Sequence, residues 1–136
     1  MGLPHDPPSV PQAVGHYTQG LEVSTGSRLL FVSGQIPVRA DGSVPTDFEG
    51  QCQVVWDNLL AVLASAGMGP EHVVKVTTYL TSRDQAEVNG RVRRERLRDA
   101  RPALTVVIAR TFAPEWLLEI EAIAASSGPP GHQGNV

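Results

Sequence analysis

The chain has 136 residues, of which 41% are hydrophobic and 18% charged, and its formal net charge is -3. This size and composition predict one soluble globular domain, and the weak negative charge gives no overall field that would attract nucleic acid or a membrane surface. Cys52 is the single cysteine, which excludes an intrachain disulfide and a thiolate metal cluster, so we expect a reducing, cytoplasmic setting.

The first residues are rich in proline, at Pro4, Pro7, Pro8 and Pro11. Proline lacks a backbone donor and disfavours helix, so we expect residues 1–12 to form an extended or disordered lead. They carry neither the basic start nor the apolar run of a signal peptide. No later stretch predicts a membrane span.

Two β-prone runs follow, at residues 21–24 and 28–33, on either side of a Thr-Gly-Ser sequence. Short strands that flank a glycine turn predict a β-hairpin. The second run ends at Ser33 and Gly34, where a glycine allows a close approach that a larger residue would prevent.

Thr46 and Glu49 have the spacing of a helix capping box, and apolar residues recur at helical spacing from there to about residue 66. This pattern predicts a helix packed on a sheet. Residues 72–80 are rich in β-branched side chains and predict a central strand.

Ser82 and Gln85 repeat the capping-box spacing and predict a second helix that ends near Arg98. Two further β-prone runs, residues 105–108 and 117–123, complete the pattern.

The last of these runs carries two carboxylates, Glu119 and Glu121. Side chains alternate across a strand, so both carboxylates share one face. An unpaired buried carboxylate costs several kcal/mol, roughly, so this face is expected to meet water, a cation or a binding site.

The predicted order is strand, strand, helix, strand, helix, strand, strand, with one more short strand near Tyr17. It indicates an α+β fold over residues 13–126, in which a mixed sheet carries both helices on one face. Residues 127–136 are rich in glycine and proline and are expected to be a flexible tail. The chain has no third helix to cover the other face of the sheet, so we expect an oligomer.

Several segments, taken in order and spacing, resemble the Rid family, also known as YjgF/UK114 or reactive intermediate deaminases. They are GHYTQG (15–20), FVSGQIP (31–37), VKVTTYL (74–80), Val88-Asn89, Pro102-Ala103 and LEIEAIA (118–124). The resemblance implies a chorismate-mutase-like fold of the bacillus type, assembled as a homotrimer around an inner β-barrel with clefts between subunits.

The resemblance also implies cofactor-free hydrolysis of imine or enamine intermediates. In such a site a glutamate positions the attacking water, and an arginine grips the substrate's carboxylate with its planar fork. Matched position by position, Glu119 corresponds to the catalytic glutamate. The implied substrate-binding residues are Tyr17, Ser33, Gly34, Asn89, Leu104 and Thr105.

Leu104 departs from the family, because the anchoring arginine is expected at this position. A charged hydrogen bond contributes about 1.5 to 3 kcal/mol, so its loss predicts at least a tenfold weaker hold on amino-acid-derived imines and an altered substrate preference. Arg110 and His16 are candidates for a displaced charge or a proton shuttle, with a solvated surface role as the alternative for each. Cys52 is expected to be inert.

Other functions remain open at this point. The cleft could bind a small metabolite without chemistry. The second helix region concentrates arginines that could bind or cleave RNA. No aromatic residues interleave with them and acidic residues partly offset them, so a solvated face, or one that forms ion pairs between subunits, is the preferred interpretation. No motif for a metal, a nucleotide or another cofactor is present in the sequence, so we expect none.

Overall fold

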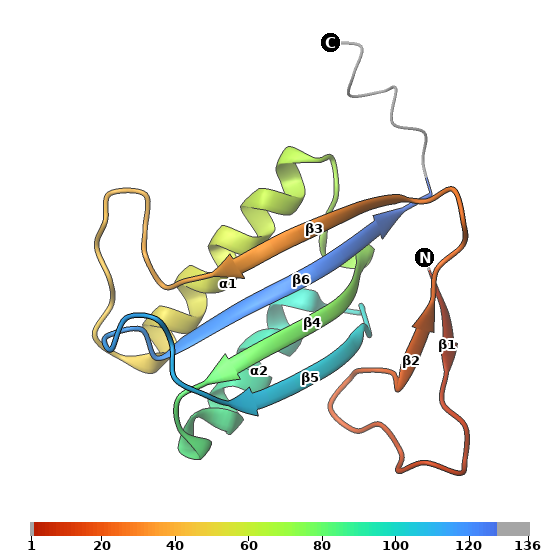
Figure 1. Ribbon diagram of the computed structural model, residues 1–136, viewed down its shortest axis with the longest axis horizontal. Helices are drawn as coiled ribbons and strands as arrows, with labels where there is room; N and C mark the ends of the chain where they lie inside the picture. Colours follow the sequence, from red (N-terminus) through yellow and green to blue (C-terminus); the bar gives the residue numbers. More distant parts are fainter. Residues whose placement is uncertain (1, 128–136) are drawn as a thin grey trace.

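The computed structural model describes residues 2–127, which form a mixed β-sheet with two α-helices against one face and a small two-stranded sheet at one side (Figure 1). This is the α+β architecture predicted from the sequence. The strands are β1 (Leu3–His5), β2 (Gly20–Glu22), β3 (Arg28–Gln35), β4 (Val73–Leu80), β5 (Ala103–Ile108) and β6 (Leu118–Ser126). The helices are α1 (Phe48–Ser65) and α2 (Ala86–Leu97), with short 3-10 turns η1 (Pro70–His72) and η2 (Arg83–Gln85).

The main sheet has the strand order β3-β6-β4-β5. The last strand, β6, is antiparallel to both of its neighbours, β3 and β4, whereas β4 and β5 are parallel and are joined through α2. The strands β3 and β5 therefore form the two edges. The interior position of β4 confirms the prediction of a central strand.

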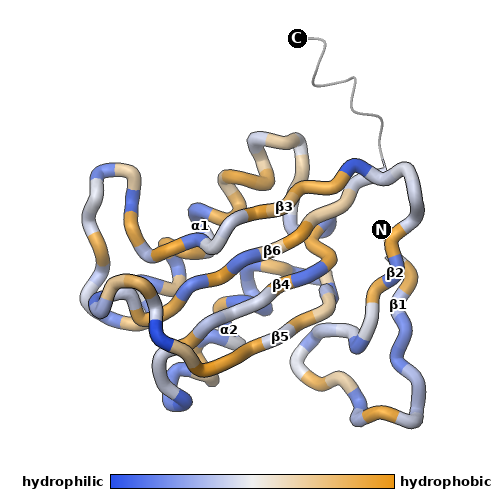
Figure 2. The backbone as a smooth tube through the Cα atoms, viewed as in Figure 1, coloured by the Kyte–Doolittle hydropathy of each residue, from blue (hydrophilic) through white to orange (hydrophobic). Residues whose placement is uncertain are grey.

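The two faces of the sheet differ because side chains alternate along each strand. On β6, Leu118, Ile120 and Ala122 are buried on the helix side, whereas Glu119 and Glu121 lie on the other face and are only partly buried. Figure 2 shows this as hydrophilic positions that interrupt a hydrophobic strand. The helices supply the other half of the core, of which the largest fully buried side chains include Trp56, Leu59 and Leu63.

Gln51 joins α1 to the loop that leads into β6. Its side chain is 2% exposed and makes three hydrogen bonds to backbone groups. The amide nitrogen donates to the carbonyl oxygens of Pro45 and Glu115, each at 2.9 Å, and the amide oxygen accepts from the Leu117 N–H at 2.8 Å. A buried polar side chain is tolerated here because its hydrogen-bonding groups are satisfied.

The predicted hairpin between residues 21–24 and 28–33 is wrong. The strand β2 pairs with β1, and β3 pairs with β6. A glycine turn permits a hairpin but does not require one, and here β3 finds a longer apolar partner in β6. The extra short strand is therefore Leu3–His5, and the segment near Tyr17 makes only an isolated bridge from Thr18 to Ala103.

The first helix begins one residue later than its predicted capping box implies. Asp47, and not Thr46, is the N-cap, and its carboxylate accepts from the Gly50 N–H at 3.0 Å. Aspartate and threonine can both accept from the unpaired backbone N–H groups of the first helical turn. The residue types alone therefore did not decide whether Thr46 or Asp47 is the N-cap. The Gln85 side chain accepts from the Ser82 N–H at 3.1 Å, so the second capping site is present. It caps the 3-10 turn η2, and α2 itself begins directly afterwards at Ala86.

The predicted tail lies, from residue 128 onward, outside the described residues. Within residues 2–127, neither helix combines the length and apolar character that crossing a membrane requires.

We expect Gln51→Leu to lower the free energy of unfolding by at least about 2 kcal/mol, because two carbonyls and one N–H lose their partner in a site closed to water. Urea unfolding at one protein concentration measures the change. Gln12→Leu is the matched control, since Gln12 is exposed, and should stay within about 0.5 kcal/mol of the wild type. Equal stabilities for Gln51→Leu and the wild type would contradict this role.

Candidate functional site

The face of the sheet that the helices leave open is the starting point for the site. It carries the polar residues Lys75, Tyr79, Glu119 and Glu121 on the two central strands. Toward the β3 edge it becomes apolar, and Phe31 is 70% exposed. Such a face combines chemistry-bearing side chains with an uncovered hydrophobic surface.

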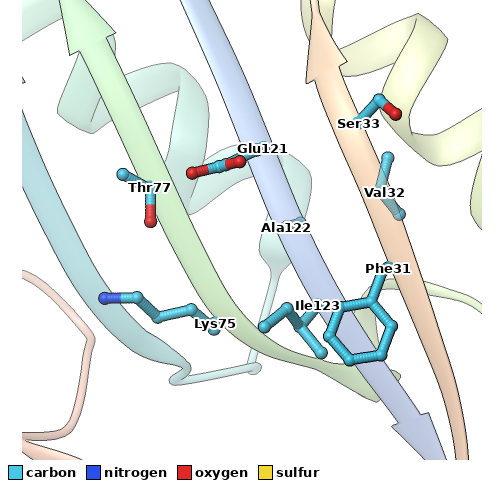
Figure 3. Close-up of a pocket in the computed structure, with 8 residues that line it drawn as sticks. All are labelled: Phe31, Val32, Ser33, Lys75, Thr77, Glu121, Ala122 and Ile123. Carbon is cyan, nitrogen blue, oxygen red and sulfur yellow. The ribbon is translucent and has the colours of Figure 1, made fainter.

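A hollow of about 330 Å³ lies on this face (Figure 3). Its lining includes Phe31, Ser33, Lys75, Thr77, Glu121 and Ile123. Figure 3 shows the carboxylate of Glu121 beside Thr77, with the apolar side chains of Phe31 and Ile123 toward the other end of the hollow. Lys75 lies toward the same end as Phe31 and Ile123, so polar side chains are present at both ends of the hollow.

Glu119 lies against Gly34 at the neighbouring strand. A Cβ atom added to Gly34 would overlap the Glu119 carboxylate group, with the added atom closest to Oε2. The pairing of β3 with β6 is irregular between Val32 and Gln35, so Ser33 and Gly34 sit in a bulge. Bulges redirect the chain locally, and this one makes room for a carboxylate between the strands.

Two hydrogen bonds hold the other polar groups of this face. The Tyr79 hydroxyl donates to Glu121 Oε2 at 2.9 Å, and Lys75 Nζ donates to Thr105 Oγ1 at 2.7 Å. The bond to Glu121 raises the pKa of Tyr79, and burial together with the charges of Glu121 and Glu119 acts in the same direction. Tyr79 is therefore a hydrogen-bond donor at neutral pH, and it fixes Glu121 while Glu119 has no such clamp among the described residues.

A second group of predicted residues lies at the opposite edge of the sheet. Beyond β5, the Thr18 N–H donates to the Pro102 carbonyl at 3.1 Å, which places the Tyr17 segment beside the start of β5. Asn89 is 2% exposed on α2, and its Oδ1 has no hydrogen-bond partner among residues 2–127. Leu104 pairs with Val76 on the helix side of the sheet and packs against the core.

The structure thus brings together some of the predicted site residues and separates others. Ser33, Gly34 and Glu119 lie together near the β3 edge. Tyr17, Asn89 and Leu104 lie near the β5 edge, and Thr105 is on the open face of β5. Three steps between neighbouring strands separate the two edges, which is about 14 Å at the usual strand spacing. One chain cannot close a small-molecule site from both groups.

The remaining candidates lie apart from these groups. His16 is exposed and has a φ of 65°, and Arg110 is exposed in the loop after β5. Cys52 is fully buried, and burial raises the pKa of its thiol to about 12. A thiol with such a pKa is protonated and a poor nucleophile, as predicted from the sequence.

The arginines of α2 are partly committed to α1. Arg91 Nη2 lies 2.8 Å from Glu49 Oε1, and Arg96 Nη2 lies 2.6 Å from Asp57 Oδ1. These pairs turn part of the basic helix into a contact between the two helices of one chain. The sequence predicted a solvated face or ion pairs between subunits, so these pairs within the chain were not foreseen.

Sequence reasoning missed Tyr79, Lys75 and Arg93. The positions of Tyr79 and Lys75 on the face of Glu119 follow from the alternation of β4, but only once its register with β6 is known. Arg93 lies four residues after Asn89, which is the spacing that puts two side chains on one helix face. Within the described residues, no cluster of three or more His, Cys, Asp or Glu side chains is placed to hold a metal ion.

Comparison with known proteins gives consistent matches over most of the chain. Residues 8–126 match the family described as Endoribonuclease L-PSP. Protein DfrA of Myxococcus xanthus is 38% identical over 119 residues, covering 85% of this chain and 89% of DfrA. TdcF of Escherichia coli, a candidate reactive intermediate deaminase, is 31% identical over 121 residues, covering 86% and 92%.

Solved structures agree with these matches. YyfB of Yersinia pestis, a Rid family protein of unknown function, superposes with a TM-score of 0.82 at 26% identity and covers 92% of this chain and 98% of its own. The crystal structure of Escherichia coli TdcF with bound serine has a TM-score of 0.69 at 31% identity and covers 86% and 93%.

The contact between Gly34 and Glu119 predicts a specific energetic coupling. Gly34→Ala should destabilise the protein by about 0.5–1 kcal/mol, because the new methyl group meets the Glu119 side chain, whose unclamped carboxylate has to turn to a less favourable rotamer. In a Glu119→Ala background the obstructing atoms are absent, so the same glycine substitution should cost close to nothing. A double-mutant cycle followed by urea unfolding measures the coupling, and additive costs would show that the two residues are independent.

Proposed function

The chain belongs to the Endoribonuclease L-PSP family, also known as the YjgF or Rid family, and from this premise we propose that it is a cofactor-free hydrolase of reactive imine or enamine intermediates. We assign the activity to the domain of residues 13–126. The observation that carries the proposal is the Glu119 carboxylate, which lies on the open face beside a glycine bulge that makes room for it.

The proposed reaction needs one oriented carboxylate. Glu119 accepts a proton from a water molecule as the water oxygen attacks the electron-poor carbon of the C=N bond. Glu119 passes this proton to the imine nitrogen, which gives a neutral amino alcohol. As the C–N bond breaks, the hydroxyl proton moves to the leaving nitrogen through the same carboxylate, so that ammonia and a carbonyl product are released and Glu119 is again ionised. Glu121 is a weaker choice for this role, because its carboxylate is already held by the Tyr79 hydroxyl at 2.9 Å.

We propose that the working form is a homotrimer. The two groups of predicted site residues lie at opposite edges of the sheet, so a complete site forms only where the β5 edge of one chain meets the β3 edge of another. Joining the edges of three copies closes a ring with three such seams and encloses the open face. Phe31 and Leu29 are 70% and 54% exposed on that face. This exposed apolar surface supports an assembly in which other copies of the chain cover the face in solution.

We further propose that the substrate preference differs from that of arginine-bearing relatives. Leu104 occupies the position where the family places its anchoring arginine, and a leucine side chain offers no donor to a carboxylate. Its packing against the core also means that it does not reach the face of Glu119.

RNA binding is the second candidate, because the family description names an endoribonuclease. The net charge of -3 and the pairing of Arg91 and Arg96 with carboxylates of α1 weaken this alternative. RNA affinity that falls steeply with salt would favour it, since phosphate contacts release counterions.

Glu119→Gln should reduce the turnover of freshly generated 2-iminobutanoate or 2-aminoacrylate by about 100-fold or more, because the amide cannot accept the proton of water. Release of ammonia in a coupled assay measures the rate. Glu87→Gln, an exposed position on α2, is the matched control and should retain wild-type turnover. Loss of turnover in Glu121→Gln with full activity in Glu119→Gln would move the catalytic role to Glu121. A wild type that hydrolyses neither these substrates nor a neutral imine without a carboxylate would contradict the proposed reaction.

Light scattering should give three times the mass of one chain for the wild type. Phe31→Asp should yield monomers, because it puts a charge on the face that assembly covers. Leu3→Asp is the control, since Leu3 is 59% exposed on the separate small sheet, and it should remain trimeric. A monomeric wild type, or a trimeric Phe31→Asp variant, would contradict the proposed assembly.

A further inference from the structure

We propose that Arg93 on α2 binds an anionic group of the ligand, a carboxylate, at the β5 edge of the cleft. The inference rests on the proposed function to the extent that this cleft is the ligand site. It supplies the positive charge that Leu104 does not.

Arg93 differs from the other arginines of its helix in burial and in pairing. It is 7% exposed, yet it has no acidic partner among the described residues. Its single hydrogen bond runs from Nη2 to the Gly15 carbonyl oxygen at 3.3 Å. A guanidinium has five N–H donors in a fixed fork, so most of the donors of Arg93 have no partner in the described part of the chain.

A buried guanidinium whose donors are mostly unpaired is costly unless a ligand or another group accepts hydrogen bonds from it. Removing a guanidinium from water without a counter-charge is strongly unfavourable, and buried charges are usually paired. Burial lowers the pKa of Arg93, and the neighbouring charge of Arg94 acts in the same direction. Arginine nevertheless stays protonated in proteins, so the buried cation persists and attracts an anion.

The surroundings of Arg93 fit a ligand rather than a structural contact alone. Asn89 lies one helical turn earlier on the same side of α2, and its buried Oδ1 also lacks a partner among residues 2–127. The carbonyl to which Arg93 bonds belongs to a loop in which Gly15 and His16 have φ angles of 86° and 65°. A left-handed residue other than glycine, here His16, costs energy, and such residues cluster at binding sites. This loop leads directly to the partly buried Tyr17.

The unpaired groups define the class of ligand. A planar guanidinium fork suits the two oxygens of a carboxylate. The unpaired oxygen of Asn89 is an acceptor, which suits an N–H group on the same small molecule. A 2-imino acid carries both groups, and its carbon–nitrogen double bond would then extend toward the seam where the neighbouring chain presents its own Glu119.

The test compares a carboxylate with its neutral amide in the intact protein. We expect the wild type to bind 2-oxobutanoate at least about tenfold more tightly than 2-oxobutanamide, measured by calorimetry or by competition against turnover. Arg93→Met should reduce this ratio to about one. Arg94→Met removes the same charge from an exposed neighbour and should leave the ratio unchanged.

Arg93→Lys keeps the positive charge but lacks the planar fork, so its preference for 2-oxobutanoate over 2-oxobutanamide should be intermediate. This variant replaces Arg93→Met in the test if the methionine variant does not fold. A purely structural role for Arg93 would change the melting temperature without changing the selectivity for the carboxylate. A wild type without that selectivity, or an Arg93→Lys or Arg93→Met variant that retains it in full, overturns the inference while leaving the proposed hydrolase intact. Selectivity that depends on Arg93 in a protein that turns over no imine would sustain the inference and reject the hydrolase.

Discussion

The alternation of side chains along β6 is the constraint on which the rest of the structure depends. One face of this strand is apolar and closes the core beneath the two helices, and the other presents Glu119 and Glu121. Because β6 lies between β3 and β4, neither carboxylate can turn toward the helices without shifting the whole register. The same strand therefore stabilises the fold and fixes the place of the candidate chemistry.

The two edges of the sheet hold different groups of the candidate site. The β3 edge carries Glu119 beside a glycine bulge, and Arg93 of α2 lies near the β5 edge with the buried Asn89 one turn before it. Within one chain the width of the sheet separates these two groups, so they do not pair with each other. In the trimer that we propose, the seam between two chains would bring them to one ligand.

Much of the fold could be predicted because periodicity reports burial. The β-branched run around Val76 marked a central strand, and the spacing of Ser82 and Gln85 located the second helix. Which strands pair with each other was harder to predict, because the turn around Gly26 is compatible with a hairpin that β3 does not form. In the candidate site, the face on which Glu119 lies followed from its strand, and its catalytic role stays a prediction from the family resemblance. Arg93, by contrast, was hidden in a run of arginines. Only burial and the absence of a carboxylate partner within the described residues distinguish it from Arg91 and Arg96.

The position of β6 also has a consequence for how the chain reaches this fold during synthesis. Of the described strands, β6 comes last in the chain, and it is inserted between β3 and β4, so that Arg28 at the start of β3 pairs with Ser126. Until residues 118–126 have emerged, β3 and the β4-β5 pair lack the strand that joins them and expose unpaired backbone to other nascent chains. Pairings so distant in sequence are slow to form, so the sheet closes late, and its unpaired strands are prone to aggregate before β6 is in place.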